Sequence, residues 1–367
     1  MAFHPPPPSF DFDTSPLLVF YELTRACDLV CRHCRACAQP KRHPHELSTE
    51  QAFALLEQLT EFPRPPLLVL TGGDPLKRPD LFEIIRRGRR LGLSVALTPS
   101  ATPLVTRDAL ARLKNEGLNR LAVSLDGLDA STHDTMRGVT GSFLQTLAIL
   151  CDALELGLPT QVNTTVTQRN LGQLDRLADQ LALFDIALWS LFFLVPVGRG
   201  RVEPRLSADQ YEQAFEILWR QTQKQRYTIK TTEAPHYRRF VLQRTGALPR
   251  MTASSVGGGS PAGPPMTGVR DGNGVMFVSH VGQIFPSGFM PVTCGRFPND
   301  SVVNAYQHHT LFKQLRDPDG FHGKCGLCEF RHVCGGSRAR AYAVAGDPLA
   351  AEPDCHYVPE MFAAVTS

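Results

Sequence analysis

The feature that most constrains the fold is an alternation of short apolar segments with amphipathic ones, repeated six times between residues 17 and 200. The apolar segments have the length and composition of strands. They are Leu17–Thr24, Pro66–Asp74, Leu93–Ala101, Arg120–Gly127, Thr160–Val166 and Trp189–Val197. Near-continuous apolar strands that alternate with helices predict a parallel sheet covered by helices. Six units in succession favour a partial (β/α)6 TIM-like barrel, an α/β fold, with an open doubly wound sheet as the alternative.

The segments between the strands have the period and the start signals of helices. The first predicted helix begins at Ser48 as its N-cap, and Gln51 stands at the position that completes a capping box. The other predicted helices cover Arg78–Gly92, Thr106–Gly117, Ser142–Gly157, Leu171–Phe184 and, after the sixth strand, Ser207–Gln225.

The chain divides into four predicted parts. Residues 1–16 form a proline-rich N-terminal arm, and residues 17–200 form the barrel. Residues 201–267 are a helical and Gly/Ser/Pro-rich connection, whose Gly/Ser/Pro-rich stretch is Met251–Pro265. Residues 268–367 form a small Cys-rich domain that begins with two β-like runs, GVMFVSH and GQIFPSG, typical of a hairpin.

Composition predicts a globular protein that binds neither nucleic acid nor a membrane. Hydrophobic residues make up 43% and charged residues 20% of the chain, and a net charge of +3 is small for 367 residues. The N-terminus lacks the features of a secretory signal, and the most apolar run, Leu181–Val195, is too short to span a bilayer. We therefore expect a cytoplasmic protein with reduced thiols. Clustered cysteines then indicate metal binding or catalysis, whereas the isolated Cys151 is expected to be a small buried side chain.

Polar motifs gather at the predicted carboxyl ends of the strands. TGGD ends the second strand, SLDG ends the fourth, Asn163 lies in the fifth, and PVGRG follows the sixth. Four cysteines follow the first strand. Because the carboxyl ends of parallel strands share one edge of the sheet, these motifs predict a single active site there.

Cys27, Cys31 and Cys34 have the spacing C-x3-C-x2-C. A tetrahedral zinc site would need a fourth ligand, which Cys37 or His33 could supply. Three thiolates on one short loop suit a cubane iron–sulfur cluster better, with one iron left open for another ligand.

This spacing directly after a first barrel strand resembles the signature of the radical S-adenosylmethionine (SAM) superfamily. The resemblance implies that Cys27, Cys31 and Cys34 bind a [4Fe–4S] cluster and that SAM occupies its fourth iron. It also implies reductive cleavage of SAM to a 5′-deoxyadenosyl radical, which abstracts a hydrogen from a substrate. Cys37 would not be a ligand, because a fourth thiolate would close the iron that SAM needs.

Further residues match positions that bind the cofactor in this superfamily. TGGDP resembles the GGE motif, whose backbone holds the amino group of SAM, with Asp74 in place of Glu. His33 stands where an aromatic residue usually precedes the third cysteine. The resemblance implies that Ser124 and Asp126 approach the ribose and that Arg137 pairs with the cofactor carboxylate. The full predicted set is His33, Gly72, Gly73, Asp74, Ser124, Asp126, Arg137 and Asn163.

The C-terminal cysteines Cys325, Cys328, Cys334 and Cys355 follow the pattern C-x2-C-x5-C-x20-C. This pattern resembles the SPASM/twitch extension of radical SAM enzymes and implies one auxiliary [4Fe–4S] cluster that assists electron transfer. A structural zinc ribbon is the alternative. Cys294 is either a fifth candidate ligand or a buried thiol.

The resemblance implies an oxidoreductase or lyase type of reaction, with an electron donor such as flavodoxin or ferredoxin. The motifs are closest to enzymes that modify tetrapyrrole side chains in anaerobic haem and haem d1 formation. A maturase of a ribosomally made peptide is the first alternative, and a zinc-stabilised binding module without enzymatic activity is the second. The candidate contacts for a tetrapyrrole are His280, His308, His309, Arg199, Arg201, Arg338 and Arg340. Each of the three histidines is more typical of an ordinary surface residue.

Overall fold

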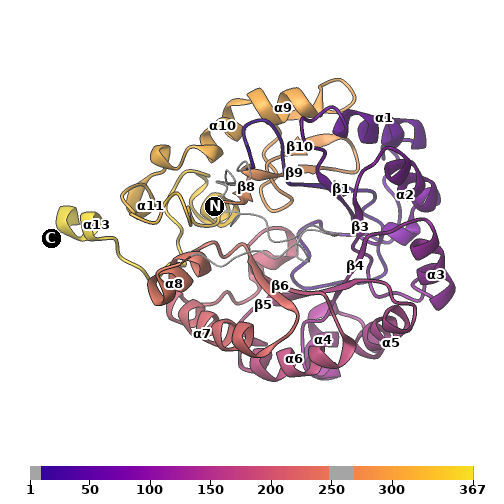
Figure 1. Cartoon of the computed structure of the whole chain (residues 1–367), viewed down its shortest axis with the longest axis horizontal. Coiled ribbons are helices and arrows are strands. Elements are labelled where there is room, and N and C mark those ends of the chain that lie inside the picture. The colour runs from indigo at the N-terminus through magenta and orange to yellow at the C-terminus, as the bar shows by residue number, and fades with distance from the viewer. Residues whose placement is uncertain (1–9, 248–267, 367) are drawn as a thin grey trace, which may run out of the picture.

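The computed structural model of the chain describes residues 10–247 and 268–366 (Figure 1). The strands of these residues form one curved sheet, with the order β11-β10-β9-β1-β2-β3-β4-β5-β6-β7 and with β8 beside β9. Helices surround the curved sheet in Figure 1, which gives the outline of an incomplete barrel. Residues 1–9 of the predicted arm and the Gly/Ser/Pro-rich stretch Met251–Pro265 lie outside the described residues.

All six predicted strands are present, and each pairs in parallel with the next one along the chain. This order confirms the partial barrel rather than an open doubly wound sheet, in which the strand order reverses. The six strands are β1 (Leu18–Glu22), β2 (Leu67–Thr71), β3 (Val95–Leu97), β4 (Arg120–Ser124), β5 (Thr160–Val166) and β6 (Leu188–Phe193).

The sheet extends beyond these six strands at both edges. β7 (Thr228–Thr232) pairs in parallel with β6, although its residues were predicted to be part of a connection. At the other edge, β9 (Gly274–Val278) pairs in parallel with β1. The antiparallel pairing of β9 with β10 (Gln283–Phe285) confirms the predicted hairpin. The remaining strands are β8 (Arg270–Asp271) and β11 (Gly295–Arg296).

The helices around the barrel follow the predicted order, with two additions. Ser48 caps the first helix, and its side chain and that of Gln51 form the predicted capping box. The additional helices are α4, an eight-residue segment capped by Asp129, and α8, which lies in the predicted connection; sequence periodicity alone indicated neither. The helices are α1 (Thr49–Leu59), α2 (Leu81–Arg90), α3 (Arg107–Asn115), α4 (Ala130–Arg137), α5 (Ser142–Glu155), α6 (Leu174–Leu181), α7 (Ala208–Lys224) and α8 (His236–Thr245).

The C-terminal part contains short helices and turns. Its helices are α9 (Val302–His308), α10 (Thr310–Arg316), α11 (Gly323–Gly326), α12 (Arg338–Ala345) and α13 (Glu360–Thr366). Short 3₁₀ turns lie at Pro75–Lys77, Leu171–Gln173, Ala182–Phe184, Gly198–Val202 and Pro318–Gly320. None of the helices in the described residues is long and apolar enough to cross a membrane.

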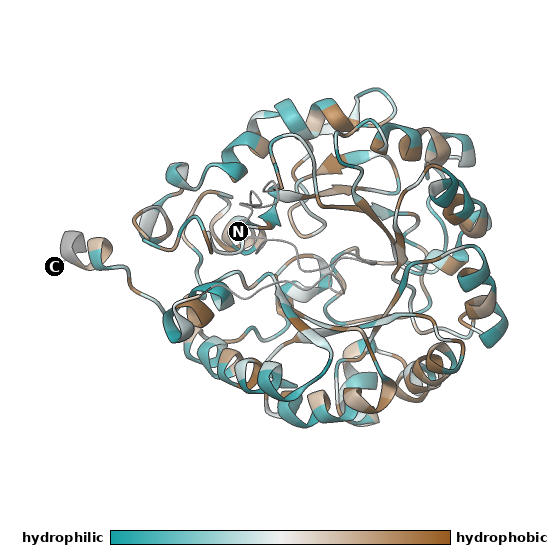
Figure 2. Cartoon of the chain, viewed as in Figure 1, coloured by the Kyte–Doolittle hydropathy of each residue, from teal (hydrophilic) through white to brown (hydrophobic). Residues whose placement is uncertain are grey.

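The main core lies between the outer face of the sheet and the helices. Figure 2 shows hydrophobic residues along the strands and hydrophilic residues on much of the surrounding helices. Outward-facing residues such as Tyr21, Val123 and Leu191 belong to this core. Because side chains alternate between the two faces of a strand, their neighbours Glu22, Ser124 and other polar residues face the interior of the barrel.

Cys151 is a correction to the sequence analysis. It lies on α5 as predicted, but its side chain is exposed rather than buried. The buried side of α5 is formed by residues such as Ile149, Leu150 and Ala153. A helix is apolar on one face only, and Cys151 falls outside that face.

The C-terminal part is joined to the barrel through Arg340. This side chain is fully buried and forms an ion pair with Glu352 at 3.0 Å. It also donates hydrogen bonds to the backbone carbonyls of Leu194, after β6, and Glu233, after β7. The prediction that Arg338 and Arg340 are available for tetrapyrrole carboxylates is wrong, because Arg338 is also fully buried and donates to the backbone carbonyl of Ala350.

Replacement of Arg340 by Ala should lower the free energy of unfolding by about 3–5 kcal/mol, because Glu352 would stay buried without its partner. Chemical denaturation followed by circular dichroism measures the effect. Arg331→Ala is the matched control, since Arg331 pairs with the exposed Asp319 at the surface, and such a pair contributes about 0–1 kcal/mol. Equal effects of the two substitutions would contradict the role assigned to Arg340.

Candidate active site

The loop after β1 carries the first cysteines and is tied to the turn after β2. The amide of Gly73 donates to the carbonyl of Thr24 at 2.8 Å, and the amide of Asp74 donates to the carbonyl of Ala26 at 2.7 Å. The loop also closes on itself, because the amide of Cys27 donates to the carbonyl of Gln39. These backbone contacts place the cysteine loop at the carboxyl edge of the sheet.

Glycine is required where the turn after β2 crosses the cysteine loop, because the two backbones lie too close together for a side chain. A Cβ atom on Gly72 would lie 2.4 Å from the carbonyl oxygen of Thr24, and one on Gly73 would lie 2.5 Å from that of Ala26. The side chain of Asp74 is buried and accepts hydrogen bonds from the hydroxyl of Thr102 and the amide of Leu76. Its carboxylate therefore shapes the turn, and burial raises its pKa above the ordinary value.

Cys27, Cys31 and Cys34 lie together in a small apolar cluster on this loop. Backbone amides donate to two of the sulfurs, from Leu29 to Cys27 Sγ and from Ala38 to Cys34 Sγ. Amide hydrogen bonds of this kind favour the thiolate form, which is the form that binds metal. No group of three or more His, Cys, Asp or Glu side chains in the described residues is arranged around a position for a single metal ion.

Charge and burial act in opposite directions on the thiols of the first cluster. Burial raises the pKa of Cys27, and the hydrogen bond with Ser100 (3.2 Å between Sγ and Oγ) counteracts this effect. Burial also raises the pKa of Cys31, and the guanidinium of Arg137, with Nη1 at 3.8 Å from Sγ, counteracts it. Since a thiolate is stabilised by a nearby cation, Arg137 favours the form of Cys31 that a cluster requires.

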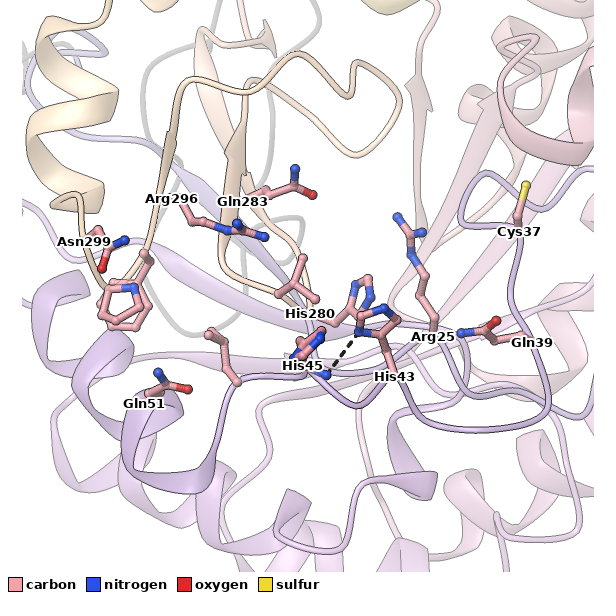
Figure 3. A pocket seen from close by; sticks show the side chains of 14 residues that line it. Arg25, Cys37, Gln39, His43, His45, Gln51, His280, Gln283, Arg296 and Asn299 are labelled. Atoms are coloured by element: carbon pink, nitrogen blue, oxygen red, sulfur yellow. Dashed lines mark hydrogen bonds between the residues drawn. The ribbon is translucent and has the colours of Figure 1, made fainter.

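Cys37 has different surroundings from the other three cysteines. It is exposed, has a positive φ of 49°, and lines a cavity together with Arg25 and His43. In Figure 3 its sulfur points away from the other labelled side chains.

Asp126, Arg137 and His33 form one buried polar group beside the cysteines. Asp126 Oδ2 lies 2.6 Å from Arg137 Nη2 and 3.6 Å from His33 Nε2. Burial alone would raise the pKa of Asp126, but the charge of Arg137 outweighs it and lowers the pKa below its ordinary value. Burial lowers the pKa of His33 to about 4, so its imidazole is neutral near pH 7.

The structure thus brings together two residues that the sequence analysis assigned to different parts of the cofactor. Asp126 and Arg137 pair with each other, and Asp126 also accepts a hydrogen bond from the amide of Thr165. Arg137 can still reach a second acceptor, because its buried Nε has no hydrogen-bond partner.

Ser124 and Asn163 lie side by side on the inner face of the sheet. They are register partners on β4 and β5, and Asn163 accepts a hydrogen bond from Gln161. The row continues with Ser190 on β6 and Lys230 on β7. Lys230 was not a predicted site residue, because β7 was not recognised as a strand of the barrel.

Glu22 is a second residue that the sequence analysis missed. It is fully buried at the end of β1 and binds His280 (Oε2 to Nδ1, 2.7 Å) and Arg35 (Oε1 to Nη1, 3.2 Å). Burial would raise its pKa, but the hydrogen bond with His280 and the charge of Arg35 lower the pKa to about 2. A glutamate inside an otherwise apolar strand was the available signal. His280 is buried, so its interpretation as a surface residue is wrong.

A cavity of about 680 Å³ opens beside the cysteine loop (Figure 3). Three imidazoles gather in it, with the rings of His45 and His280 at 5.5 and 5.3 Å from that of His43. Arg25, which also pairs with Glu22, and Arg296 line it as well, and the described lining contains no acidic side chain.

The four C-terminal cysteines Cys325, Cys328, Cys334 and Cys355 line one cavity. Backbone amides donate to two of the sulfurs, from Glu352 to Cys325 Sγ at 3.2 Å and from Gly336 to Cys334 Sγ at 3.4 Å. The sequence separates these cysteines by up to thirty positions, and folding brings them together.

Basic groups line the same C-terminal cavity. They include Lys324, Arg239 and Arg331. Burial raises the pKa of Cys355, and Lys324 and Arg239 counteract that effect. Burial also raises the pKa of Cys328 to about 11. Four thiols with nearby cations and amide donors fit a cluster held through thiolates.

Cys294 does not line that cavity. It is buried in the main core, and its thiol donates a weak hydrogen bond to the carbonyl of Val292. Burial raises its pKa to about 12. The sequence left two alternatives for Cys294, a fifth cluster ligand or a buried thiol, and its position in the core supports the buried thiol.

The other candidate tetrapyrrole contacts differ in their positions. Arg199 binds the cysteine loop, because its guanidinium donates hydrogen bonds to the carbonyls of Cys31 and Ala38. Arg201 and His308 are exposed. His309 accepts a hydrogen bond from the amide of Leu311 and so caps α10.

Cys37→Ala should leave the iron content and SAM cleavage unchanged, because Cys37 lies apart from the other three thiols. Cys34→Ala should abolish cleavage and the first cluster, because it removes one of the three predicted ligands. Iron analysis and 5′-deoxyadenosine production by the anaerobically prepared proteins measure both effects. Loss of cleavage in Cys37→Ala would show that the ligand set has been assigned incorrectly.

Comparison with known proteins identifies the family. Residues 21–181 match the family model described as Radical SAM superfamily. The chain is 37% identical to the AdoMet-dependent heme synthase of Methanosarcina barkeri over 94% of this chain and 97% of that protein. It is 29% identical to the pre-heme d1 synthase of Dinoroseobacter shibae over 96% of this chain and 89% of that protein.

The fold has a close counterpart among solved structures. The crystal structure of Streptococcus suis SuiB bound to S-adenosylmethionine superposes with a TM-score of 0.72, at 15% identity, over 94% of this chain and 78% of that one. The matched family model, the long alignment with the relatives and this barrel agree. The chain belongs to the radical SAM superfamily.

Proposed function

We propose that this radical SAM enzyme modifies a side chain of a tetrapyrrole in haem formation. The observation that carries the proposal is the 37% identity to an AdoMet-dependent heme synthase over nearly the full length of both chains. Since the alignment includes both the barrel and the Cys-rich part, the proposal covers the whole described architecture.

Cys27, Cys31 and Cys34 would hold the first [4Fe–4S] cluster. Their grouping on one loop, their amide donors and the adjacent Arg137 fit this role. When bound, the cluster supplies the electron for cleavage of SAM to a 5′-deoxyadenosyl radical. The chain itself fixes the loop through Gly73 and Asp74, and Cys37 is exposed whereas Cys27 and Cys31 are buried.

The predicted cofactor residues would orient SAM on the inner face of the sheet. Ser124 and Asn163 present polar side chains there in adjacent register positions. Asp126 holds Arg137 in place, and the free Nε of Arg137 provides a donor for the cofactor carboxylate. The neutral imidazole of His33 provides a flat surface next to this group.

Cys325, Cys328, Cys334 and Cys355 would hold one auxiliary [4Fe–4S] cluster. The cavity that they line and its amide donors support a thiolate site, and a zinc site remains the alternative. An auxiliary cluster would assist electron transfer between substrate and an external donor such as flavodoxin or ferredoxin.

The basic cavity beside the cysteine loop supports an acidic, planar substrate. Arg25 and Arg296 can pair with carboxylates, and the imidazoles of His43, His45 and His280 add donors and flat surfaces. A tetrapyrrole that carries propionates has both properties. A peptide is the alternative substrate, and the carboxylates of such a peptide would meet the same groups.

The decisive test is anaerobic turnover with labelled substrate. An iron tetrapyrrole with deuterated propionate side chains should transfer deuterium to 5′-deoxyadenosine when reduced enzyme and SAM are present. Mass spectrometry of 5′-deoxyadenosine measures the transfer. Its absence, together with transfer from a deuterated peptide, would refute the tetrapyrrole proposal and support a peptide substrate.

Iron content distinguishes the auxiliary cluster from zinc. Two cubane clusters require about eight irons per chain. A Cys27/Cys31/Cys34→Ala variant should retain about half of the iron and lose SAM cleavage. The matched Cys325/Cys328/Cys334→Ala variant should also retain about half, but it should keep SAM cleavage. About four irons and one zinc per wild-type chain would show that the C-terminal cysteines hold zinc and not an auxiliary cluster.

A further inference from the structure

Four polar residues form a continuous row across the inner face of the sheet. Ser124, Asn163, Ser190 and Lys230 are successive register partners on β4, β5, β6 and β7. The hydroxyls of Ser190 and Thr232 lie 3.2 Å apart, which shows that these two side chains share a face. Because side chains two positions apart in a strand face the same way, Lys230 faces the interior of the barrel with Thr232.

Lys230 is the charged member of this row and has no carboxylate beside it. It forms no ion pair or hydrogen bond with any side chain in the described part of the chain. Burial, together with Arg120, lowers the pKa of Lys230 to about 8.

The lack of a counter-ion sets Lys230 apart from other charges inside the barrel. Glu22 pairs with His280, and Asp126 pairs with Arg137. A half-buried ammonium group without a counter-ion loses hydration and gains nothing in return. An anion beside Lys230 would supply the missing counter-ion and accept charge-assisted hydrogen bonds from its ammonium group.

We propose that Lys230 binds a carboxylate of the substrate inside the barrel and thereby positions the substrate next to SAM. The inference rests on the proposed function, because it takes the carboxylate to be a propionate of the tetrapyrrole. Ser190 stands between Lys230 and Asn163, one of the residues assigned to SAM.

The spacing along the row supports a substrate contact rather than a cofactor contact. Neighbouring strands are about 4.8 Å apart, so the backbones of Asn163 and Lys230 are separated by roughly 10 Å. Ser124 and Asn163 would contact SAM, and Arg137 lies near the cysteines, where the cofactor carboxylate is expected. Lys230 therefore lies two strands beyond Asn163, where a second molecule bound next to SAM would meet it.

The test measures binding and does not depend on turnover. Holoprotein with its clusters is titrated anaerobically with coproporphyrin III, which has four propionates, and the Soret band is followed. Lys230→Gln should weaken binding at least tenfold, a change of about 1.4 kcal/mol, which a hydrogen bond to a charged group can account for. Lys230→Arg should restore most of the affinity because it restores the positive charge.

Lys224→Gln is the matched control. Lys224 ends α7, where it is exposed and pairs with Asp179, so its replacement should leave porphyrin affinity unchanged. SAM affinity and iron content are measured for every variant and should equal those of the wild type. These two measurements show whether Lys230→Gln has damaged the fold or the cofactor site.

The outcomes separate the two proposals. If wild-type protein binds coproporphyrin III and Lys230→Gln binds it equally well, the role of Lys230 is refuted while the proposed function stands. If Lys230→Gln weakens SAM binding as much as porphyrin binding, Lys230 belongs to the cofactor site and the inference is wrong. If the wild type binds no porphyrin, the proposed function fails and this inference fails with it.

Discussion

The active site depends on one steric constraint, the close crossing of two backbones at Gly72 and Gly73. The turn after β2 approaches the cysteine loop so closely that its amides bond to the carbonyls of Thr24 and Ala26. A side chain on either glycine would overlap these carbonyls. Without this crossing, a loop rich in small and polar residues would have no fixed position at the edge of the sheet, and its thiols would not share one place.

Charge pairing then fixes the residues around the loop. Asp126 is buried and stays ionised because Arg137 lies beside it. Arg137 in turn places a positive charge near Cys31, where thiolate has to form. Glu22 plays a similar part on the other side, where it holds His280 and Arg35. Lys230 is the exception to this pairing, and that makes it informative about the molecule that the barrel accepts.

The C-terminal part is connected to the barrel in two ways. β9 pairs with β1, so the strand that leads to the first cysteines has a C-terminal strand as its neighbour. Arg340 donates to the carbonyl of Leu194 after β6 and pairs with Glu352, which lies three positions before Cys355, the last cysteine. The two groups of cysteines are therefore attached to one sheet.

Local sequence patterns were sufficient for the order of elements and for the first cysteine motif. Apolar runs and caps such as that of Ser48 are encoded within a few residues, so the six strands and their helices could be predicted. The spacing of Cys27, Cys31 and Cys34 likewise lies within one loop. Each of these signals depends on neighbours along the chain, which a sequence shows directly.

Tertiary structure alone decided the contacts between distant segments. The pairing of β7 and β9 with the barrel, the binding of Arg340 to Glu352 and the burial of His280 against Glu22 join residues that are far apart in the sequence. An arginine on a loop and an arginine inside a buried ion pair have the same letter in a sequence. Their difference arises from the partner that folding brings to them, and for that reason Lys230 became a candidate only when β7 took its place in the sheet.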